Sequence, residues 1–338
     1  MSLLEFLASA QQQGHADADL VSVITALADA AEQIDHLVRR DGLGVNLGSE
    51  IGDTNADGDS QKALDVRSEE IIIEALKGPN GNHQGAAALL SEEQDTPIPL
   101  NDNGSLIVAV DPLDGSSNIS VNVTIGTIFS ILPANGDADA NSLQPGRNQI
   151  AAGFFTYGPQ TTLIMCFAAS DNVVTFTLDP DGKGFVKTGE GVKIPSTTKE
   201  FAINSAYTNH WFKPVQNWMA DTLAGQSGPQ GKDYRMRWVG SLVSDAWRIF
   251  QRGGIFLYPA DQRPGNETGR LRLVYEANPI ALLAEKAGGK ASNGEGAILD
   301  MMPQHLHQRV PLFFGASSEV TRLENDHKNN ARMNPKES

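Results

Sequence analysis

Apolar side chains recur every three or four residues near the start of the chain, which is the spacing of one face of an α-helix. The residues that share this spacing are Leu20, Val23, Ile24, Leu27, Ala31, Ile34 and Val38. A similar pattern over residues 64–76 stops at Lys77-Gly78-Pro79, where a glycine and a proline end a helix. We therefore predict amphipathic helices over residues 20–40 and 64–77, with a glycine-rich loop over residues 42–59 between them.

Other segments have the pattern of β-strands. Residues 106–110 are all apolar, which is typical of a strand covered on both faces, and Asp111 follows directly. Two apolar runs on either side of residues 157–160 predict a hairpin. The predicted strands besides residues 106–110 are residues 86–91, 121–132, 150–156, 161–167 and 173–178. The first half of the chain therefore combines helices with a sizeable sheet.

The second half alternates short helical and strand patterns. We predict helices over residues 242–251 and 279–287, and strands over residues 254–258 and 270–275. The tail after Leu323 lacks an apolar face and is expected to be frayed. The alternation favours an α/β (α+β) protein with a larger amino-terminal domain over residues 1–195 and a smaller carboxyl-terminal domain over residues 196–335.

The composition and charge narrow the classes of partner. The chain has 338 residues, of which 40% are hydrophobic and 20% are charged, as in ordinary globular proteins. Acidic residues exceed basic residues by 41 to 26, which gives a net charge of −15. Such a surface repels nucleic-acid phosphates and anionic lipids, so we expect neither partner. A small anionic substrate would need a bound cation or locally placed arginines.

Cysteine content and hydropathy indicate a cytoplasmic protein. Cys166 is the single cysteine of the chain, which excludes an intramolecular disulfide and a cysteine-cluster metal site. Residues 1–18 carry acids and glutamines where a secretion signal would have an apolar run. Cys166 falls in a predicted strand and is expected in the core, so regulation through this thiol is not expected.

The most informative motif is Asp111-Pro112-Leu113-Asp114-Gly115-Ser116-Ser117-Asn118. It places two carboxylates three residues apart at the end of a buried strand, followed by small residues with accessible backbone N–H groups. Carboxylates are ligands for hard cations such as Mg²⁺, and the N–H groups can bind phosphoryl oxygens. The motif thus predicts a cation site beside an oxyanion cradle. The structural alternative is an acidic turn stabilised by Asx hydrogen bonds.

At this motif the chain resembles the class I fructose-1,6-bisphosphatases, within the Mg²⁺-dependent, lithium-sensitive sugar and inositol phosphatases. The resemblance continues in order along nearly the whole chain, in residues 90–93, 123–131, 143–147, 239–241, 253–259 and 271–279. It implies a layered αβαβα fold and hydrolysis of the 1-phosphate of D-fructose 1,6-bisphosphate. A catalytically silent binding protein with the same fold is the remote alternative.

The resemblance also implies a metal site and a group that activates water. The carboxylates of Glu92, Asp111, Asp114 and Glu276, with the carbonyl of Leu113, would bind two or three Mg²⁺ ions, with Mn²⁺ as an alternative ion. The residues that match the water-activating pair are Asp59 and Glu93, and Asp65 matches a supporting acid. Two neighbouring carboxylates suit a general base because their proximity raises one of the two pKa values.

The same resemblance implies where the sugar phosphate binds. The expected residues are Asp114, the Gly115, Ser116 and Ser117 cradle, Asn204, Tyr207, Arg237, Trp238, Tyr258 and Arg270. Arg237 would reach across a subunit interface, which implies a homotetramer or homodimer. Trp238 and Arg270 replace the family's usual tyrosine and lysine. These two departures leave sedoheptulose 1,7-bisphosphate, or dual specificity, as the alternative substrate.

Residues that bind AMP in regulated members of the family have no counterpart in this chain. Residues 17–21 lack the usual phosphate-binding stretch, and Ser105, Leu106 and Pro133 replace a lysine, a tyrosine and an arginine. Asp17 and Asp19 would repel a phosphate at a helix start. We therefore expect weak or no inhibition by AMP. His305 and His307 are expected in packing or at the surface, rather than at a metal site. The residues Trp211, Phe212 and Trp218 are expected in the core or at a subunit interface.

Overall fold

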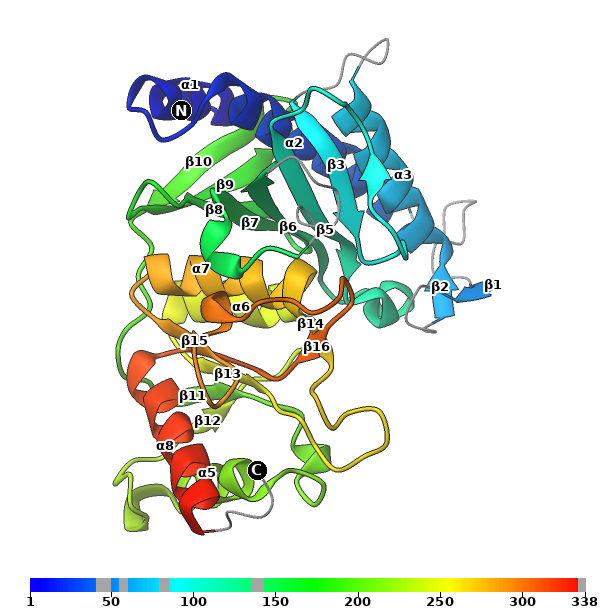
Figure 1. Ribbon diagram of the computed structural model, residues 1–338. Coiled ribbons are helices and arrows are strands. Elements are labelled where there is room, and N and C mark those ends of the chain that lie inside the picture. Colours follow the sequence, from blue (N-terminus) through cyan, green and yellow to red (C-terminus); the bar gives the residue numbers. More distant parts are fainter. Residues whose placement is uncertain (41–49, 55–59, 79–84, 135–142, 334–338) are drawn as a thin grey trace.

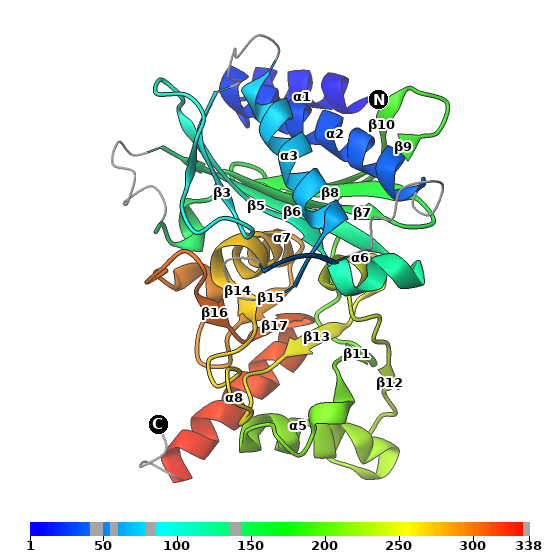
Figure 2. The same ribbon diagram turned by 90° about the vertical axis from the view of Figure 1, so that its right-hand side faces the viewer.

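The computed structural model describes residues 1–40, 50–54, 60–78, 85–134 and 143–333, and it consists of alternating layers of helices and sheets (Figure 1). Helices cover the outer face of an eight-stranded sheet, two helices lie between this sheet and a five-stranded sheet, and further helices cover the second sheet from outside (Figure 2). The layered α/β architecture expected from the sequence is therefore confirmed.

The eight-stranded sheet has the order β10-β9-β8-β7-β6-β5-β3-β4. Its neighbouring strands are antiparallel except for β3 and β5, which run parallel. The strands are β3 (Ala86–Ser91), β4 (Ile98–Pro99), β5 (Leu106–Asp114), β6 (Ile125–Pro133), β7 (Ala151–Tyr157), β8 (Thr161–Phe167), β9 (Val173–Asp179) and β10 (Gly184–Glu190). The predicted hairpin is β7 and β8.

Both faces of this sheet are buried, which explains its continuous apolar strands. Helices α1 (Leu3–Gln12), α2 (Ala18–Val38) and α3 (Ala63–Lys77) cover one face. Phe129 and Ile131 of β6 pack into the core under these helices, whereas Ile128 packs into the core on the opposite face. The alternation follows from the two-residue repeat of side chains along a strand.

The middle layer consists of α6 (Leu242–Arg252) and α7 (Asn278–Lys286). Both helices pack against the eight-stranded sheet on one side and the five-stranded sheet on the other, and one apolar cluster includes residues of all three layers. Helix α7 is buried over most of its length, so its position is tied to both sheets.

The five-stranded sheet has the order β12-β11-β13-β17-β15. Its strands are β11 (Glu200–Ala202), β12 (Arg235–Met236), β13 (Ile255–Tyr258), β15 (Lys290–Ser292) and β17 (Leu312–Gly315). Helices α5 (Lys213–Leu223) and α8 (Ser317–Met333) cover its outer face, where Trp211 and Trp218 are buried and Phe212 is 41% exposed. The remaining strands form two two-stranded sheets. One consists of β1 (Glu50–Thr54) and β2 (Ser60–Lys62), and the other of β14 (Leu271–Arg272) and β16 (Arg309–Val310).

The predicted bounds of two strands, residues 121–132 and 270–275, were partly wrong. Residues 116–121 form a 3₁₀ helix, and Asn122 has a φ of 56°, so β6 begins only at Ile125. Strand β14 ends at Arg272, and residues 273–277 form a π-helical turn instead. That turn is fully buried, and an apolar run of this length fits a buried strand and a buried helical turn equally well.

The prediction of a frayed tail was also wrong, because α8 continues to Met333. Val320 and Leu323 are buried against the five-stranded sheet. Glu324 forms an ion pair of 2.5 Å with Lys290, and the His327 ring lies 5.9 Å from that of Phe313. Tertiary contacts thus stabilise the part of the helix beyond Leu323, where almost all residues are polar.

Candidate active site

Two parallel strands deliver acidic residues to one edge of the eight-stranded sheet. Ser91 of β3 lies opposite Val110 of β5, so the next residues, Glu92 and Asp111, emerge side by side at the carboxyl ends of the strands. The Glu92 backbone N–H donates to the Val110 carbonyl at 3.1 Å and continues the ladder by one residue. The carboxyl end of parallel strands is the usual place for a site in α/β proteins.

Three buried carboxylates converge at this edge. Asp111 and Asp114 lie at the end of β5, and Glu276 lies in the π-helical turn that precedes α7. One ligand atom from each lies within 4.8 Å of the others, and the residues are only 4%, 8% and 5% exposed. Segments far apart in the sequence therefore bring together one cluster of oxygen atoms that could hold a metal ion.

Burial and mutual repulsion make these carboxylates hard to ionise. Burial raises the pKa of Asp111 well above its usual range, and the charge of Glu92 adds to the effect. The pKa of Glu276 is raised by the same two causes. Burial raises the pKa of Asp114 to about 6, although hydrogen bonds from the Val243 N–H at 2.8 Å and the Ser241 hydroxyl at 3.2 Å oppose the rise. A bound cation would relieve this accumulated negative charge.

Arg272 is part of the site, and the sequence reasoning missed it. Its side chain is 6% exposed, and its Nη2 lies 3.2 Å from Oε1 of Glu92. Its backbone N–H donates to Oε2 of Glu276 at 2.5 Å. One buried arginine thus connects acids from the two halves of the chain. The available signal was a charged residue inside a stretch assigned as a buried strand, because buried charges are nearly always paired.

The small residues after Asp114 form a tight loop against the segment before α6. Gly115 has a φ of +81°, and a Cβ atom there would lie 3.1 Å from that of Ser241. Asn118 Nδ2 donates to the Gly240 carbonyl at 3.1 Å. Ser116 and Ser117 begin the 3₁₀ helix directly beside the carboxylates. A glycine is required here both for the backbone conformation and for the close approach.

The structure describes two of the three acids that were predicted to activate water, Glu93 and Asp65. Glu93 follows Glu92, its backbone N–H donates to the Ser91 hydroxyl at 3.3 Å, and its charge contributes to the raised pKa of Asp111. Asp65 is buried in the first turn of α3. Asp59 lies outside the described residues.

Tyr258 of β13 and Trp238, which follows β12, form an aromatic group with Phe256. Trp238 stacks on Phe256, with ring centroids 5.8 Å apart, and its centroid is 6.1 Å from that of Tyr258. Burial raises the pKa of Tyr258, and the charge of Arg270 opposes the rise while that of Glu276 adds to it. Tyr258 therefore feels the charges of both Glu276 and Arg270.

Asn204 and Tyr207 lie in the loop that follows β11, and an arginine from another loop packs on it. Asn204 Oδ1 accepts the Ala206 N–H at 3.2 Å and begins the 3₁₀ helix Ser205–Tyr207. The Arg263 guanidinium lies 3.5 Å from the centre of the Tyr207 ring, and its Nη2 is 2.6 Å from Oδ2 of Asp261. Arg263 was not predicted, and a lone arginine in a polar loop gave no signal of this stacking.

Arg237 lies apart from these groups, just after β12. Its side chain is exposed, its Nη1 donates to the Met236 carbonyl at 3.3 Å, and its charge acts on Glu200 of β11. β12 ends the hydrogen-bonded order of its sheet. Arg237 therefore extends from an edge strand, where a second protein chain could be reached.

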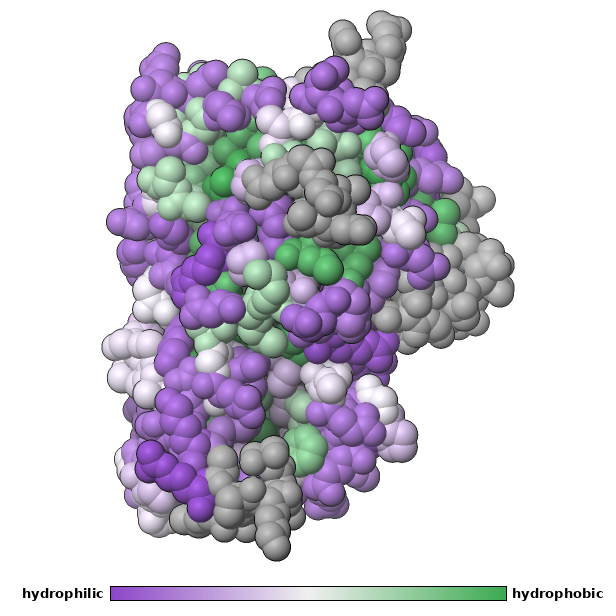
Figure 3. Space-filling view, in the orientation of Figure 1, coloured by the Kyte–Doolittle hydropathy of each residue, from purple (hydrophilic) through white to green (hydrophobic). Residues whose placement is uncertain are grey.

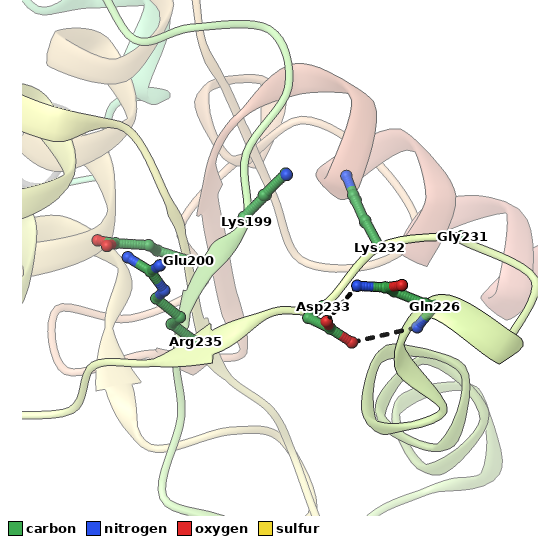
Figure 4. Close-up of a pocket in the computed structure, with 7 residues that line it drawn as sticks. All are labelled: Lys199, Glu200, Gln226, Gly231, Lys232, Asp233 and Arg235. Carbon is green, nitrogen blue, oxygen red and sulfur yellow. Dashed lines mark hydrogen bonds between the residues drawn. The ribbon is translucent and has the colours of Figure 1, made fainter.

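A separate hollow of about 380 Å³ lies beside the same edge (Figure 4). Its lining residues are Lys199, Glu200, Gln226, Gly231, Lys232, Asp233 and Arg235. Lys232 is paired with Glu319 at 3.0 Å, and Gln226 is bonded to Asp233 at 2.8 Å. None of the predicted site residues lines this hollow, so the acidic cluster remains the candidate for chemistry.

Two family models together match almost the whole chain. The model of the amino-terminal domain of fructose-1-6-bisphosphatase matches residues 1–190, and that of the carboxyl-terminal domain matches residues 194–328. The chain belongs to the class 1 fructose-1,6-bisphosphatase family. A curated member from Azorhizobium caulinodans is 50% identical over 90% of this chain and 92% of its own. Another, from Neisseria meningitidis serogroup B, is 45% identical over 96% and 99%.

A solved structure supports the same family. The chain is similar to holo fructose-1,6-bisphosphatase from Leishmania major, with a TM-score of 0.86 and 28% identity, over 97% of this chain and 99% of that one. Fructose-1,6-bisphosphatases are metal-dependent and act on sugar bisphosphates, and the acidic cluster provides the oxygen donors that hard cations prefer. The acidic cluster thus fits the metal dependence of this family.

Within the described ranges, no helix is both long and apolar enough to cross a bilayer. Hydrophilic residues cover most of the face in Figure 3, and hydrophobic residues lie in separate patches.

Proposed function

We propose that the chain hydrolyses the 1-phosphate of D-fructose 1,6-bisphosphate to fructose 6-phosphate and inorganic phosphate. The observation that carries the proposal is the convergence of Asp111, Asp114 and Glu276 within 4.8 Å in a chain of the class 1 fructose-1,6-bisphosphatase family. Both curated relatives described above bear the name of this enzyme. The reducing cytoplasm is the proposed location, and Cys166 is a buried free thiol.

The metal centre comprises Glu92, Asp111, Asp114, Glu276 and the Leu113 carbonyl, with Mg²⁺ as the proposed ion, two or three per subunit, and Mn²⁺ as an alternative. The donors fit this ion because they are all oxygen atoms, and the three clustered carboxylates are buried with raised pKa values. Metal binding favours the ionised form of these carboxylates and therefore opposes the rise in their pKa values. Bound metal supplies Lewis-acid polarisation of the phosphoryl group and lowers the pKa of an attacking water.

The remaining acids and the loop have proposed roles in the same reaction. Glu93 and Asp59 accept the proton of the attacking water, and Asp65 supports this pair. The backbone N–H groups of Gly115, Ser116 and Ser117 donate hydrogen bonds to the phosphoryl oxygens, on which charge accumulates during transfer.

The second phosphate binds on the side of the five-stranded sheet. Arg270, Tyr258, Tyr207 and Asn204 provide the charge and hydrogen bonds, and Trp238 packs beside the sugar. Arg270 can form a forked pair with phosphate oxygens, which a chain with a net charge of −15 needs to hold an anion. Arg237 completes this subsite in a second copy of the chain, so we propose a homodimer or homotetramer.

The deciding experiment compares phosphate release from fructose 1,6-bisphosphate and from sedoheptulose 1,7-bisphosphate, with and without Mg²⁺. Asp114→Asn removes one metal-binding charge while retaining the side-chain shape, and we expect activity to fall at least about 100-fold. The control is Asp171→Asn, because the Asp171 side chain is fully exposed.

The outcomes separate the candidate functions. Mg²⁺-dependent release from the fructose ester that is lost in Asp114→Asn and retained in Asp171→Asn supports the proposal. Faster turnover of the heptulose ester would reassign the substrate through the Trp238 and Arg270 subsite. If the wild-type chain releases no phosphate from either ester, a catalytically silent binding protein is the remaining candidate function.

A further inference from the structure

The connection between β6 and β7 contacts the first turn of α7. This connection includes the short 3₁₀ helix Gly146–Asn148 and also Gln149. Both belong to the predicted amino-terminal domain, residues 1–195. Helix α7 begins at Asn278, only two residues after the clustered carboxylate of Glu276. The contact therefore lies next to the metal centre but is made by residues without an assigned role.

Gln149 makes the central hydrogen bonds of this contact. Its side chain is only 2% exposed, and its Nε2 donates to the carbonyl of Gly146 at 2.8 Å and to that of Asn278 at 3.0 Å. A Cβ atom on Gly146 would lie 2.5 Å from Oδ1 of Asn278 and 2.8 Å from a methyl carbon of Leu299. The missing side chain of the glycine thus allows the backbone of the connection to approach the start of α7.

Gln149 is an unfavourable residue for this place unless its amide is needed. Its Oε1 is buried and has no hydrogen-bond partner among the described residues. A buried polar atom without a partner opposes folding, and an apolar side chain of the same size would avoid that cost. The two hydrogen bonds from Nε2 are the feature that methionine or leucine could not replace.

Glu276 needs such support more than the other clustered acids. Asp111 and Asp114 share one strand, whereas Glu276 approaches them from the other half of the chain. Like charges at this distance repel one another, and metal ligation tolerates displacements of only about 0.5 Å. The start of α7 must therefore be held against the eight-stranded sheet.

We propose that Gln149 is a positioning residue for the metal centre: by bonding the Asn278 carbonyl, it fixes the first turn of α7 and thereby holds the Glu276 carboxylate beside Asp111 and Asp114. This inference rests on the metal-dependent function proposed above. It assigns a role to a residue that touches neither the metal nor the substrate.

The test measures Mn²⁺ binding to the full chain by titration calorimetry in the absence of substrate. Gln149→Met retains the length of the side chain and removes the amide, and we expect the dissociation constant for Mn²⁺ to rise about 10- to 100-fold. The Mg²⁺ concentration for half-maximal activity should rise in parallel, while KM for fructose 1,6-bisphosphate stays within about threefold.

Arg147→Met is the matched control in the same connection. Arg147 is half-exposed and pairs at 2.5 Å with Glu285, at the other end of α7, and at 2.7 Å with Asp300 of the 3₁₀ helix Ile298–Asp300. We expect its loss to change Mn²⁺ affinity less than about threefold, as is usual for exposed ion pairs. Circular dichroism and the melting temperature verify folding. If Gln149→Met does not fold, Gln149→Asn, which retains an amide but is one methylene shorter, should weaken binding in the same direction.

Three results would overturn the inference. Wild-type Mn²⁺ affinity in a folded Gln149 variant would show that Glu276 needs no such support. Equal losses in Gln149→Met and Arg147→Met would indicate general loosening of α7 instead of positioning at its start. A wild-type chain that neither binds Mn²⁺ nor releases phosphate would overturn the proposed function as well, whereas the first two results leave that function intact.

Discussion

Each carboxylate of the cluster is oriented by a backbone N–H group. Asp111 Oδ1 accepts the Leu113 N–H at 2.9 Å, Asp114 Oδ2 accepts the Val243 N–H at 2.8 Å, and Glu276 Oε2 accepts the Arg272 N–H at 2.5 Å. Such bonds orient the carboxylates before any ligand binds, which reduces the cost of assembling a metal site. At the scale of residues, the chemistry therefore depends on main-chain geometry as much as on side-chain identity.

The thiol of Cys166 is predicted to be unreactive in the folded protein. Burial raises its pKa to about 12 from an ordinary value of 9.0, so the thiol stays protonated throughout the physiological range. We expect iodoacetamide to alkylate the native protein about 1,000-fold more slowly than the unfolded protein between about pH 7 and pH 9. Mass spectrometry measures both rates. Rapid stoichiometric labelling of the native chain would contradict a core location.

At the scale of elements, the start of α2 is occupied by the chain's own acids. Asp17 caps the helix by accepting the Leu20 N–H at 2.8 Å, and the Ser105 hydroxyl donates to Asp19 Oδ2. A Cβ atom on Gly85 would lie 2.6 Å from that of Asp19, so Asp19 also packs closely against the sheet. A helix start usually attracts anions, but these two carboxylates already compensate its partial positive charge.

This arrangement predicts that AMP does not inhibit the enzyme. A nucleotide phosphate at the α2 start would face two carboxylates and would have to displace the Asp19 contact with Ser105. Phosphate release from fructose 1,6-bisphosphate should therefore change less than twofold at about 1 mM AMP. Inhibition at low micromolar AMP would contradict the prediction and would place a nucleotide site elsewhere.

The carboxyl-terminal part of α8 is predicted to contribute to stability. Glu324 is 7% exposed and pairs with Lys290, which is one-third exposed. Glu324→Gln should lower the free energy of unfolding by about 1–3 kcal/mol, because the lysine loses its partner in a partly buried place. Denaturant unfolding measures the change, and Glu295→Gln, at an exposed position, is the control. Equal stability of both variants would show that the helix end adds nothing to the fold.

At the scale of the whole molecule, the proposed role of Arg237 predicts a site that two subunits share. If Arg237 acts in a second copy of the chain, Arg237→Ala and Asp114→Asn each inactivate different parts of one composite site. Co-expression of the two variants in equal amounts should restore about one quarter of wild-type activity, because a quarter of the sites combine an intact Asp114 with an intact Arg237. Activity no higher than that of the separate variants would show that Arg237 does not act in a neighbouring subunit.

The sequence by itself determined the features that depend on neighbouring residues. Helical spacing predicted α2 and α3, and the apolar run before Asp111 predicted β5, because these patterns are local. The motif around Asp114 and the long family resemblance pointed to the metal centre and the reaction. The roles of individual site residues and the domain division at residue 195 stay predictions, and Asp59 lies outside the described structure.

Only the tertiary structure decided which distant residues meet. Arg272 lies in a strand, as predicted, but its ion pair with Glu92 of the other half of the chain was not predicted. Gln149 approaches Asn278, and Arg263 stacks on Tyr207, through contacts that no local pattern records. The end of α8 is helical because it packs on the second sheet, although its own sequence lacks an apolar face. Burial and close approach are properties of the packed molecule, so periodicity and composition along the chain do not specify them.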